Sequence, residues 1–332
     1  MDREQEEMQF LGLFDIFKES YKIVFTWRKI FSQITLALIL PLSFIFLAHI
    51  QISDLISADI NRDEDQLDQT QAGSARNKKL NDLIFSELTY LMLFKFAYFT
   101  FFLIFSLLST AAVVYTIACI YTARDVSFKK VMSVVPKVWK RLMVTFLCIF
   151  GAIFAYNIVA GFLFITWFIL LSDTSVGVVS FLAFLVLYFV GVVYLGIIWQ
   201  LASVVSVLEE ACGVKAMIKS RQLIRGKIWI AAIINFTLNL SLFIIQAVFE
   251  RLVVHGRSLN MVNRVSYGII CFLLLFKLFL FGLVIHTVIY FVCKSYHHEN
   301  IDKSALSDHL EVYLGEYVPL KSKDVQLEQF EV

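Results

Sequence analysis

The stretch Ser266–Cys293 reads SYGIICFLLLFKLFLFGLVIHTVIYFVC, and it decides the class of fold. Apart from Lys277 it carries no Asp, Glu, Lys or Arg. It is longer than the run of about 20 apolar residues that a helix needs to cross a bilayer. Backbone polar groups in lipid must be satisfied inside the protein, so an apolar run of this length predicts a helix and not an open strand.

Five more stretches have the same character, while the chain as a whole is 59% hydrophobic and only 17% charged. Soluble domains are about 45–50% apolar and about 25% charged, so the excess predicts burial in lipid. We therefore expect an all-α fold, a polytopic membrane helix bundle of about six transmembrane helices. The five further spans are expected at Ile30–Ile52, Leu88–Tyr121, Leu142–Leu171, Val176–Leu208 and Trp229–Glu250.

The basic residues are distributed unevenly between the two sides of these spans. Twenty of the 29 Lys and Arg residues flank one side and seven flank the other. Basic residues favour the cytosolic side, so we expect both termini in the cytosol of an integral multi-pass protein. The endoplasmic reticulum and the plasma membrane are the organelles we expect. The organisation is then an N-terminal interfacial helix (1–29), a six-span domain (30–293) and a cytosolic tail (294–332).

Within the six-span domain, 53–87 is the one long hydrophilic insertion, and it lies on the outer side. Its segment Asp59–Gly73 is rich in Asp, Gln and Asn. We expect this outer loop to be solvated and partly disordered, because such a composition cannot bury much apolar surface.

Each cytosolic flank before spans one, three and five mixes apolar and basic residues and ends near a Trp. Apolar residues recur at helical spacing in the first flank and in the third, which predicts amphipathic helices lying in the membrane interface. We expect a threefold internal repeat, each unit an interfacial helix followed by two spans. The basic residues expected to contact anionic lipid headgroups are Arg28, Lys29, Lys140, Arg141, Lys215, Lys219, Arg221, Arg225 and Lys227.

The third flank carries the pattern E-x-x-G-x-x-A-x-x-x-S-x-x-L-x-x-G over Glu210–Gly226. It resembles the interfacial motif of the membrane domain attached to some bacterial glycerophosphodiester phosphodiesterases. The whole chain resembles a plant family of uncharacterised six-span transmembrane proteins, and YLGEYVPL at Tyr313–Leu320 is similar to that family's C-terminal signature. The bacterial catalytic barrel is a separate soluble domain, so the resemblance implies no catalytic activity.

Four polar residues inside spans five and six are candidates for an intramembrane polar site: Lys277, Asn239, His286 and Gln246. Lys277 is eleven residues into its predicted span, too deep to reach the interface easily, and an intramembrane charge is a functional candidate. The alternative is that Lys277 only ties spans together through polar contacts.

These patterns favour a non-enzymatic membrane protein that interacts with lipid, or organises it, at the cytosolic leaflet. The alternative is a transporter or channel with a polar path near Lys277 and Asn239. We expect no cofactor and no metal, and the net charge of +2 predicts no nucleic-acid partner. The small-residue steps Gly151-x-x-x-Ala155 and Asn157-x-x-x-Gly161 predict homo- or hetero-oligomers through close helix packing.

Overall fold

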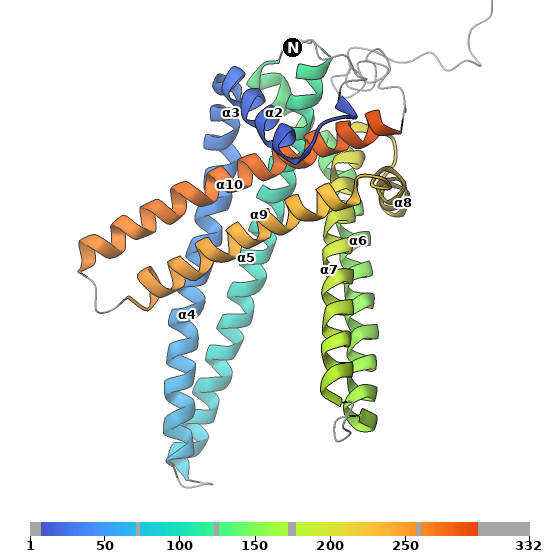
Figure 1. Cartoon of the computed structure of the whole chain (residues 1–332). Helices are drawn as coiled ribbons and strands as arrows, with labels where there is room; N and C mark the ends of the chain where they lie inside the picture. The colour runs from blue at the N-terminus through green and yellow to red at the C-terminus, as the bar shows by residue number, and fades with distance from the viewer. Residues whose placement is uncertain (1–7, 71–73, 123–125, 172–176, 257–259, 298–332) are drawn as a thin grey trace, which may run out of the picture. The chain divides into compact units, whose positions relative to one another are not determined.

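The computed structural model describes residues 8–297 except 71–73, 123–125, 172–176 and 257–259, and the regular elements of these ranges are helices (Figure 1). The predicted tail and its signature, beyond residue 297, lie outside the described residues. In chain order the elements are α2 (Leu13–Thr26), α3 (Arg28–Ile34), η1 (Thr35–Ile39), α4 (Leu40–Asp68), α5 (Ala75–Tyr121), α6 (Phe128–Leu171), α7 (Gly177–Leu208), α8 (Val214–Leu223), α9 (Ile228–Phe249), η2 (Glu250–Val254) and α10 (Met261–Tyr296).

Six helical stretches of the described chain are long and apolar enough to cross a membrane, which confirms the all-α fold. The fourth, Gly177–Leu208, agrees with its predicted bounds within one residue. The first two, Arg28–Leu67 and Arg76–Tyr121, run far beyond theirs.

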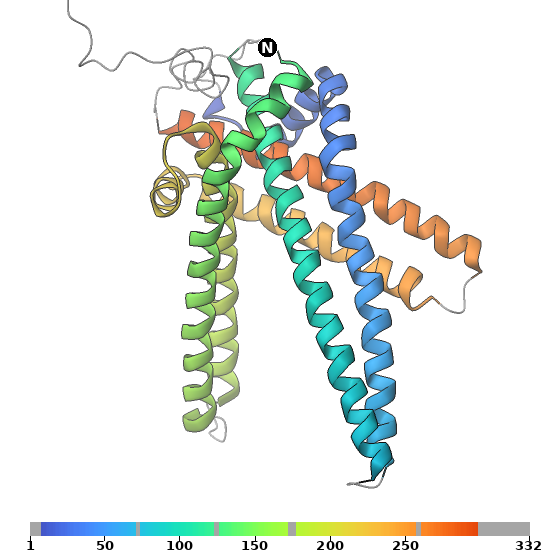
Figure 2. The same cartoon turned by 180° about the vertical axis from the view of Figure 1, so that it is seen from behind.

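The predicted outer loop is a helical hairpin in the residues that the structure describes. Helix α4 continues to Asp68 and α5 begins at Ala75, and the two run side by side (Figures 1 and 2). A buried cluster of Ile60, Ile84 and Leu91 joins them. In the described part of Asp59–Gly73 the expected partial disorder was wrong, because Ile60 packs against Ile84 and Leu91, which lie seven residues apart on α5.

The first span contains a proline and continues as helix. Pro41 lacks an N–H, and the preceding residues Thr35–Ile39 form a π-helical turn in which Leu40 N–H donates to the Thr35 carbonyl. The Ser43 hydroxyl donates to the Ile39 carbonyl at 2.8 Å. The irregular turn therefore keeps backbone groups satisfied where lipid could not satisfy them.

The chain divides into two compact units, and each is described here by itself. Unit 2 comprises 32–109 and 237–282, and holds α4 with parts of α5, α9 and α10. Its core is a cluster of five buried residues, Leu47, Phe249, Val254, Cys271 and Leu275. These come from α4, α9, η2 and α10, so residues far apart in the sequence hold this unit together.

Unit 1 comprises 1–31, 110–236 and 283–332, and contains α2, α6, α7 and α8 entire. Helices α6 and α7 run side by side along their length (Figures 1 and 2). Tyr156 donates to the Tyr188 carbonyl at 3.0 Å, and Trp167 donates to Ser180 at 2.9 Å. Polar side chains therefore link this pair at several levels, where lipid offers no other partners.

Helices α6 and α7 approach each other closely at Gly191, where an added Cβ would overlap the Tyr156 hydroxyl. The predicted small-residue steps lie elsewhere on α6. Nothing within 4 Å would meet a Cβ at Gly151 or Gly161. The oligomer that we predicted through these steps stays a prediction.

Of the three predicted interfacial stretches, the first and third are separate helices, α2 and α8. The second is the start of α6, which continues through Pro136 into the span and bends near its beginning (Figure 2). A proline inside a helix removes one hydrogen bond and kinks it without ending it here. The expected threefold repeat is therefore irregular in its second unit.

The helical hairpin makes a testable prediction. Replacing Ile60 with Ala should open a cavity between α4 and α5 and cost about 2–5 kcal/mol of local stability. Hydrogen exchange measured by mass spectrometry should then accelerate in 56–68 and 78–91. Leu55→Ala, at an exposed position of the same helix, is the control and should leave exchange unchanged. Complete exchange of these segments within seconds in the wild type would contradict the hairpin.

Candidate functional site

Two glycines bracket the short helix α8, and both have left-handed backbone conformations. Gly213 has a φ of 60° and Gly226 a φ of 92°. Side chains other than hydrogen rarely tolerate this region. A Cβ at 213 would lie 3.2 Å from the Cys148 Sγ, and a Cβ at 226 would overlap the Tyr296 ring. The backbone therefore requires glycine at both ends of α8.

One face of α8 packs against the protein. Ala216, Ser220 and Leu223, spaced by four and three residues, are buried. The Ser220 hydroxyl donates to the Ile198 carbonyl of α7 at 3.1 Å. These three residues and the two glycines are five of the six fixed positions of the pattern over Glu210–Gly226. The pattern thus describes how α8 docks, and Glu210 at its first position is exposed.

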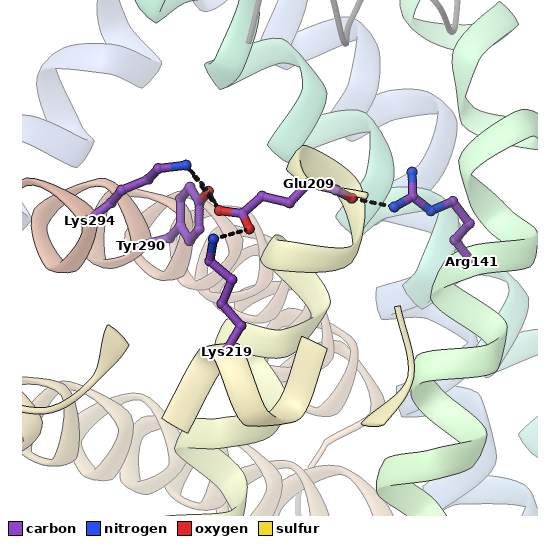
Figure 3. Close-up of polar contacts among 5 residues, drawn as sticks. All are labelled: Arg141, Glu209, Lys219, Tyr290 and Lys294. Atoms are coloured by element: carbon purple, nitrogen blue, oxygen red, sulfur yellow. Dashed lines mark hydrogen bonds and ion pairs between the residues drawn. The ribbon is translucent and has the colours of Figure 1, made fainter. Parts of the chain in front are cut away.

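The carboxylate of Glu209, in the turn after α7, contacts residues from two other helices (Figure 3). Its Oε2 lies 2.7 Å from the Lys219 Nζ of α8. Its Oε1 accepts hydrogen bonds from the Tyr290 hydroxyl at 2.6 Å and from the Lys294 Nζ at 3.0 Å, both on α10. We call these four side chains the Glu209 cluster.

The Glu209 cluster is only partly accessible to solvent, so its electrostatic interactions are weakly screened. The side chain of Glu209 is 13% exposed, that of Lys294 16% and that of Lys219 32%. Burial by itself would raise the pKa of the Glu209 carboxyl. The hydrogen bonds from Lys219 and Tyr290 and the charge of Lys294 outweigh burial, and the pKa lies below its usual value. Glu209 is therefore a carboxylate at neutral pH.

The backbone of the same turn is also fixed. The Glu209 carbonyl accepts a hydrogen bond from the Arg141 guanidinium of α6 (Figure 3). The Thr145 hydroxyl accepts from the Gly213 N–H at 2.8 Å and lies 2.7 Å from the Ser206 hydroxyl. The hydroxyls of Thr145 and Ser206 also contact the Arg141 and Ala202 carbonyls of their own helices, so either can be the donor in the pair. Residues of α6 therefore hold both ends of the α7–α8 turn.

The sequence alone suggested a different role for Glu209. Two adjacent acids between an apolar run and an amphipathic stretch predict the start of the interfacial helix, because acidic residues favour helix N-termini. That interpretation was wrong, because α8 begins at Val214, after Gly213. The available signal was the spacing of Tyr290 and Lys294, which lie one turn apart at the predicted cytosolic end of α10.

The nine predicted headgroup contacts fall into two groups. Three have protein partners: Lys219 contacts Glu209, Arg141 donates to the Glu209 carbonyl, and Lys227 lies 5.5 Å from the centre of the Tyr296 ring. The other six are exposed, and Lys29 among them also has an interaction within the protein: Arg28, Lys29, Lys140, Lys215, Arg221 and Arg225.

The outward face of α8 combines apolar and basic side chains. Val214 is 59% exposed and Ile218 54% exposed, Arg221 continues the same stripe at helical spacing, and Arg225 is exposed in the turn after α8. Trp229, at the start of α9, is 80% exposed. This arrangement is typical of a helix that lies in the interface of a membrane.

Helix α2 has a similar division into two faces. Ile16 and Ile23 are buried on one face. Phe14, Tyr21 and Phe25 are exposed on another, and the last two rings are stacked with centroids 4.1 Å apart. Aromatic side chains are enriched at the boundary between acyl chains and headgroups.

The four predicted intramembrane residues do not form one group. Lys277 and Asn239 are exposed and Gln246 is half-buried, all in unit 2. His286 lies in unit 1, where it lines a small cavity with Gln200 and Asn235. Glu209, Gln200 and Asn235 were not among the site residues predicted from the sequence. The proposed path near Lys277 and Asn239 stays a prediction.

No three His, Cys, Asp or Glu side chains of the described chain lie close enough to hold a metal ion. The His297 Nε2 lies 3.0 Å from the carbonyls of Leu223 and Arg225. A ring nitrogen between two carbonyl oxygens must carry the proton, so His297 caps the end of α8.

The helical fold and the contacts around α8 are the features to compare with known proteins. Residues 1–330 match the model of a single family, described as a domain of unknown function, DUF8558. The chain belongs to this uncharacterised family. The DUF8558 match covers both compact units, so the Glu209 cluster and α8 lie within it. No curated protein and no solved structure matches the chain.

The Glu209 cluster predicts a specific sensitivity to substitution. Glu209→Gln removes the negative charge and leaves Lys219 and Lys294 together in a partly buried site. We expect a loss of about 1–3 kcal/mol in stability at neutral pH. Thermal unfolding in detergent measures it, and Glu210→Gln, one residue away and exposed, is the matched control.

The same pair of variants predicts a pH dependence. Because the folded-state pKa of Glu209 is lowered, its contribution is present above the unfolded-state pKa of about 4.3 and is lost as the pH falls through the folded-state value. The difference between wild type and Glu209→Gln should therefore shrink below about pH 4. An equal effect of Glu210→Gln, or a difference that grows in acid, would contradict the cluster's role.

Proposed function

We propose that this protein is a non-enzymatic membrane component that binds anionic phospholipids at the cytosolic leaflet. The outward face of α8 carries the proposal. Val214 and Ile218 are exposed next to Lys215, Arg221 and Arg225, while the opposite face is docked by its buried residues. In water such a surface would leave apolar area unburied, whereas in the interface the apolar side chains meet acyl chains and the basic ones meet phosphates.

The position of α8 in the chain supports a membrane surface as its ligand. The long apolar helix α7 ends at Leu208, and the next, α9, starts at Ile228. Helix α8 therefore lies between two long apolar helices and within a few residues of each, which supports a position close to a membrane boundary. Each Lys or Arg near an anionic leaflet contributes about 1 kcal/mol to binding.

The proposal includes an orientation with both termini in the cytosol, supported by the uneven distribution of Lys and Arg. Epitope tags at each end should be digested when protease is added to sealed, cytosol-out vesicles. A tag inserted between α4 and α5 should be protected. Protection of either terminal tag would contradict the orientation and, with it, the cytosolic leaflet as the ligand.

If the protein binds anionic lipid here, removing positive charges from α8 and the turn after it should lower the affinity for that lipid. The triple variant Lys215→Gln, Arg221→Gln and Arg225→Gln should bind phosphatidylserine about 100-fold more weakly, since three contacts contribute about 3 kcal/mol. Native mass spectrometry of the purified protein, titrated with phosphatidylserine or phosphatidylcholine, measures this.

A matched control neutralises three basic residues of the outer hairpin, Arg62→Gln, Lys78→Gln and Lys79→Gln. It should bind phosphatidylserine as the wild type does. Binding should also weaken with rising salt, because exposed charges are screened over a Debye length of about 8 Å at physiological ionic strength. Equal affinity of the wild type for both lipids would refute the proposal.

Two finer proposals rest on the sequence. One is a relation to the plant six-span family and to the membrane domain of bacterial glycerophosphodiester phosphodiesterases, supported by the glycine pattern around α8. The other is the alternative function, transport. Solute flux in liposomes that the variant Lys277→Leu abolishes would favour it over lipid binding.

A further inference from the structure

Three spans of unit 1 each carry a polar residue at a similar depth. Gln200 lies eight residues before α7 ends at Leu208, and Asn235 seven residues after α9 begins at Ile228. His286 lies ten residues before α10 ends at Tyr296. A helix rises about 1.5 Å per residue, so each of the three residues lies about 10–15 Å from one end of its own helix. These ends are the C-terminus of α7, the N-terminus of α9 and the C-terminus of α10.

These three side chains line one small cavity. The rest of its lining is apolar and includes Ile224, at the end of α8, and Ala231 of α9. The volume is about 10 Å³, which is close to the least space that holds one water molecule. A cavity of this size is too small for a solute larger than water.

The polar groups around the cavity are not all satisfied by the protein. Asn235 has an interaction partner, but the side chains of Gln200 and His286 make no hydrogen bond to another residue of the described chain. In lipid an unpaired amide or imidazole is costly, because no solvent replaces the missing partner.

We propose that this cavity binds one water molecule that bridges Gln200, Asn235 and His286. Water suits the site because it both donates and accepts hydrogen bonds, as do an amide and a neutral imidazole. Buried waters in proteins make about three hydrogen bonds, with a range of about two to four. Gln200 and His286 offer two groups without another partner in the described chain, and Asn235, which also has a partner of its own, lines the same cavity. The bridge joins α7, α9 and α10 beside the end of α8, and it is independent of the lipid-binding proposal.

Filling the cavity distinguishes a wet site from a dry one. Ala231→Val adds two methyl groups to the lining and displaces the water, leaving Gln200 and His286 unpaired. The midpoint of thermal unfolding in detergent should fall by about 2–4 °C relative to the matched control Ala232→Val, the next residue of the same helix. A dry cavity would instead gain packing, so a rise in the midpoint would overturn the proposal.

A second measurement detects the water directly and does not depend on how well valine fits. Water-edited solid-state NMR of the wild-type protein in lipid, with ¹⁵N-labelled histidine, should show transfer of magnetisation from water to a histidine ring within the membrane. The signal is assigned to His286 by its loss in His286→Leu. Transfer at His286 supports the bridge, and its absence, with the ring resonance observed, overturns it.

Discussion

The carboxylate of Glu209 connects α8 to α10 and is central to the arrangement around α8. It accepts hydrogen bonds from Lys219 on α8 and from Tyr290 and Lys294 on α10, while the carbonyl of the same residue accepts from Arg141 on α6. One residue in the turn after α7 therefore contacts three other helices, α6, α8 and α10. Electrostatic interactions are stronger in this partly buried place than at an open surface.

This connection decides which stripe of α8 faces outward. A helix of ten residues is too short to be stable by itself in water, so its packing and not its propensity sets its position. Lys219 is drawn toward Glu209, and Ala216, Ser220 and Leu223 face the protein. Val214 and Ile218 then remain outward, beside exposed basic residues.

In lipid every polar group needs a hydrogen-bond partner inside the protein, and this requirement explains several features of the structure. The π-helical turn before Pro41 satisfies backbone groups near a missing N–H. Pairs such as Tyr156 with the Tyr188 carbonyl link α6 to α7. Where the protein leaves Gln200 and His286 without a partner, a cavity of the size of a water lies beside them. The cost of an unpaired group in lipid makes each of these arrangements favourable.

The sequence by itself determined the all-α class and the six spans, because the length of an apolar run depends only on the thickness of the bilayer. It also located α2 and α8 through their helical spacing. It did not determine the outer hairpin, where Ile60 and Ile84 are apolar residues in a polar stretch and become informative only when they meet.

The tertiary structure alone decided the partners of Glu209 and the polar cavity. Glu209 is 81 residues from Tyr290 and 85 from Lys294. Local rules concern neighbours within a turn or two of the same helix, so they assigned Glu209 to the nearest helix N-terminus. Local rules also cannot distinguish Lys215 from Lys219, because both are basic residues of the same short helix. Only packing shows that one faces outward and the other a carboxylate, because side-chain burial depends on which helices come together in space.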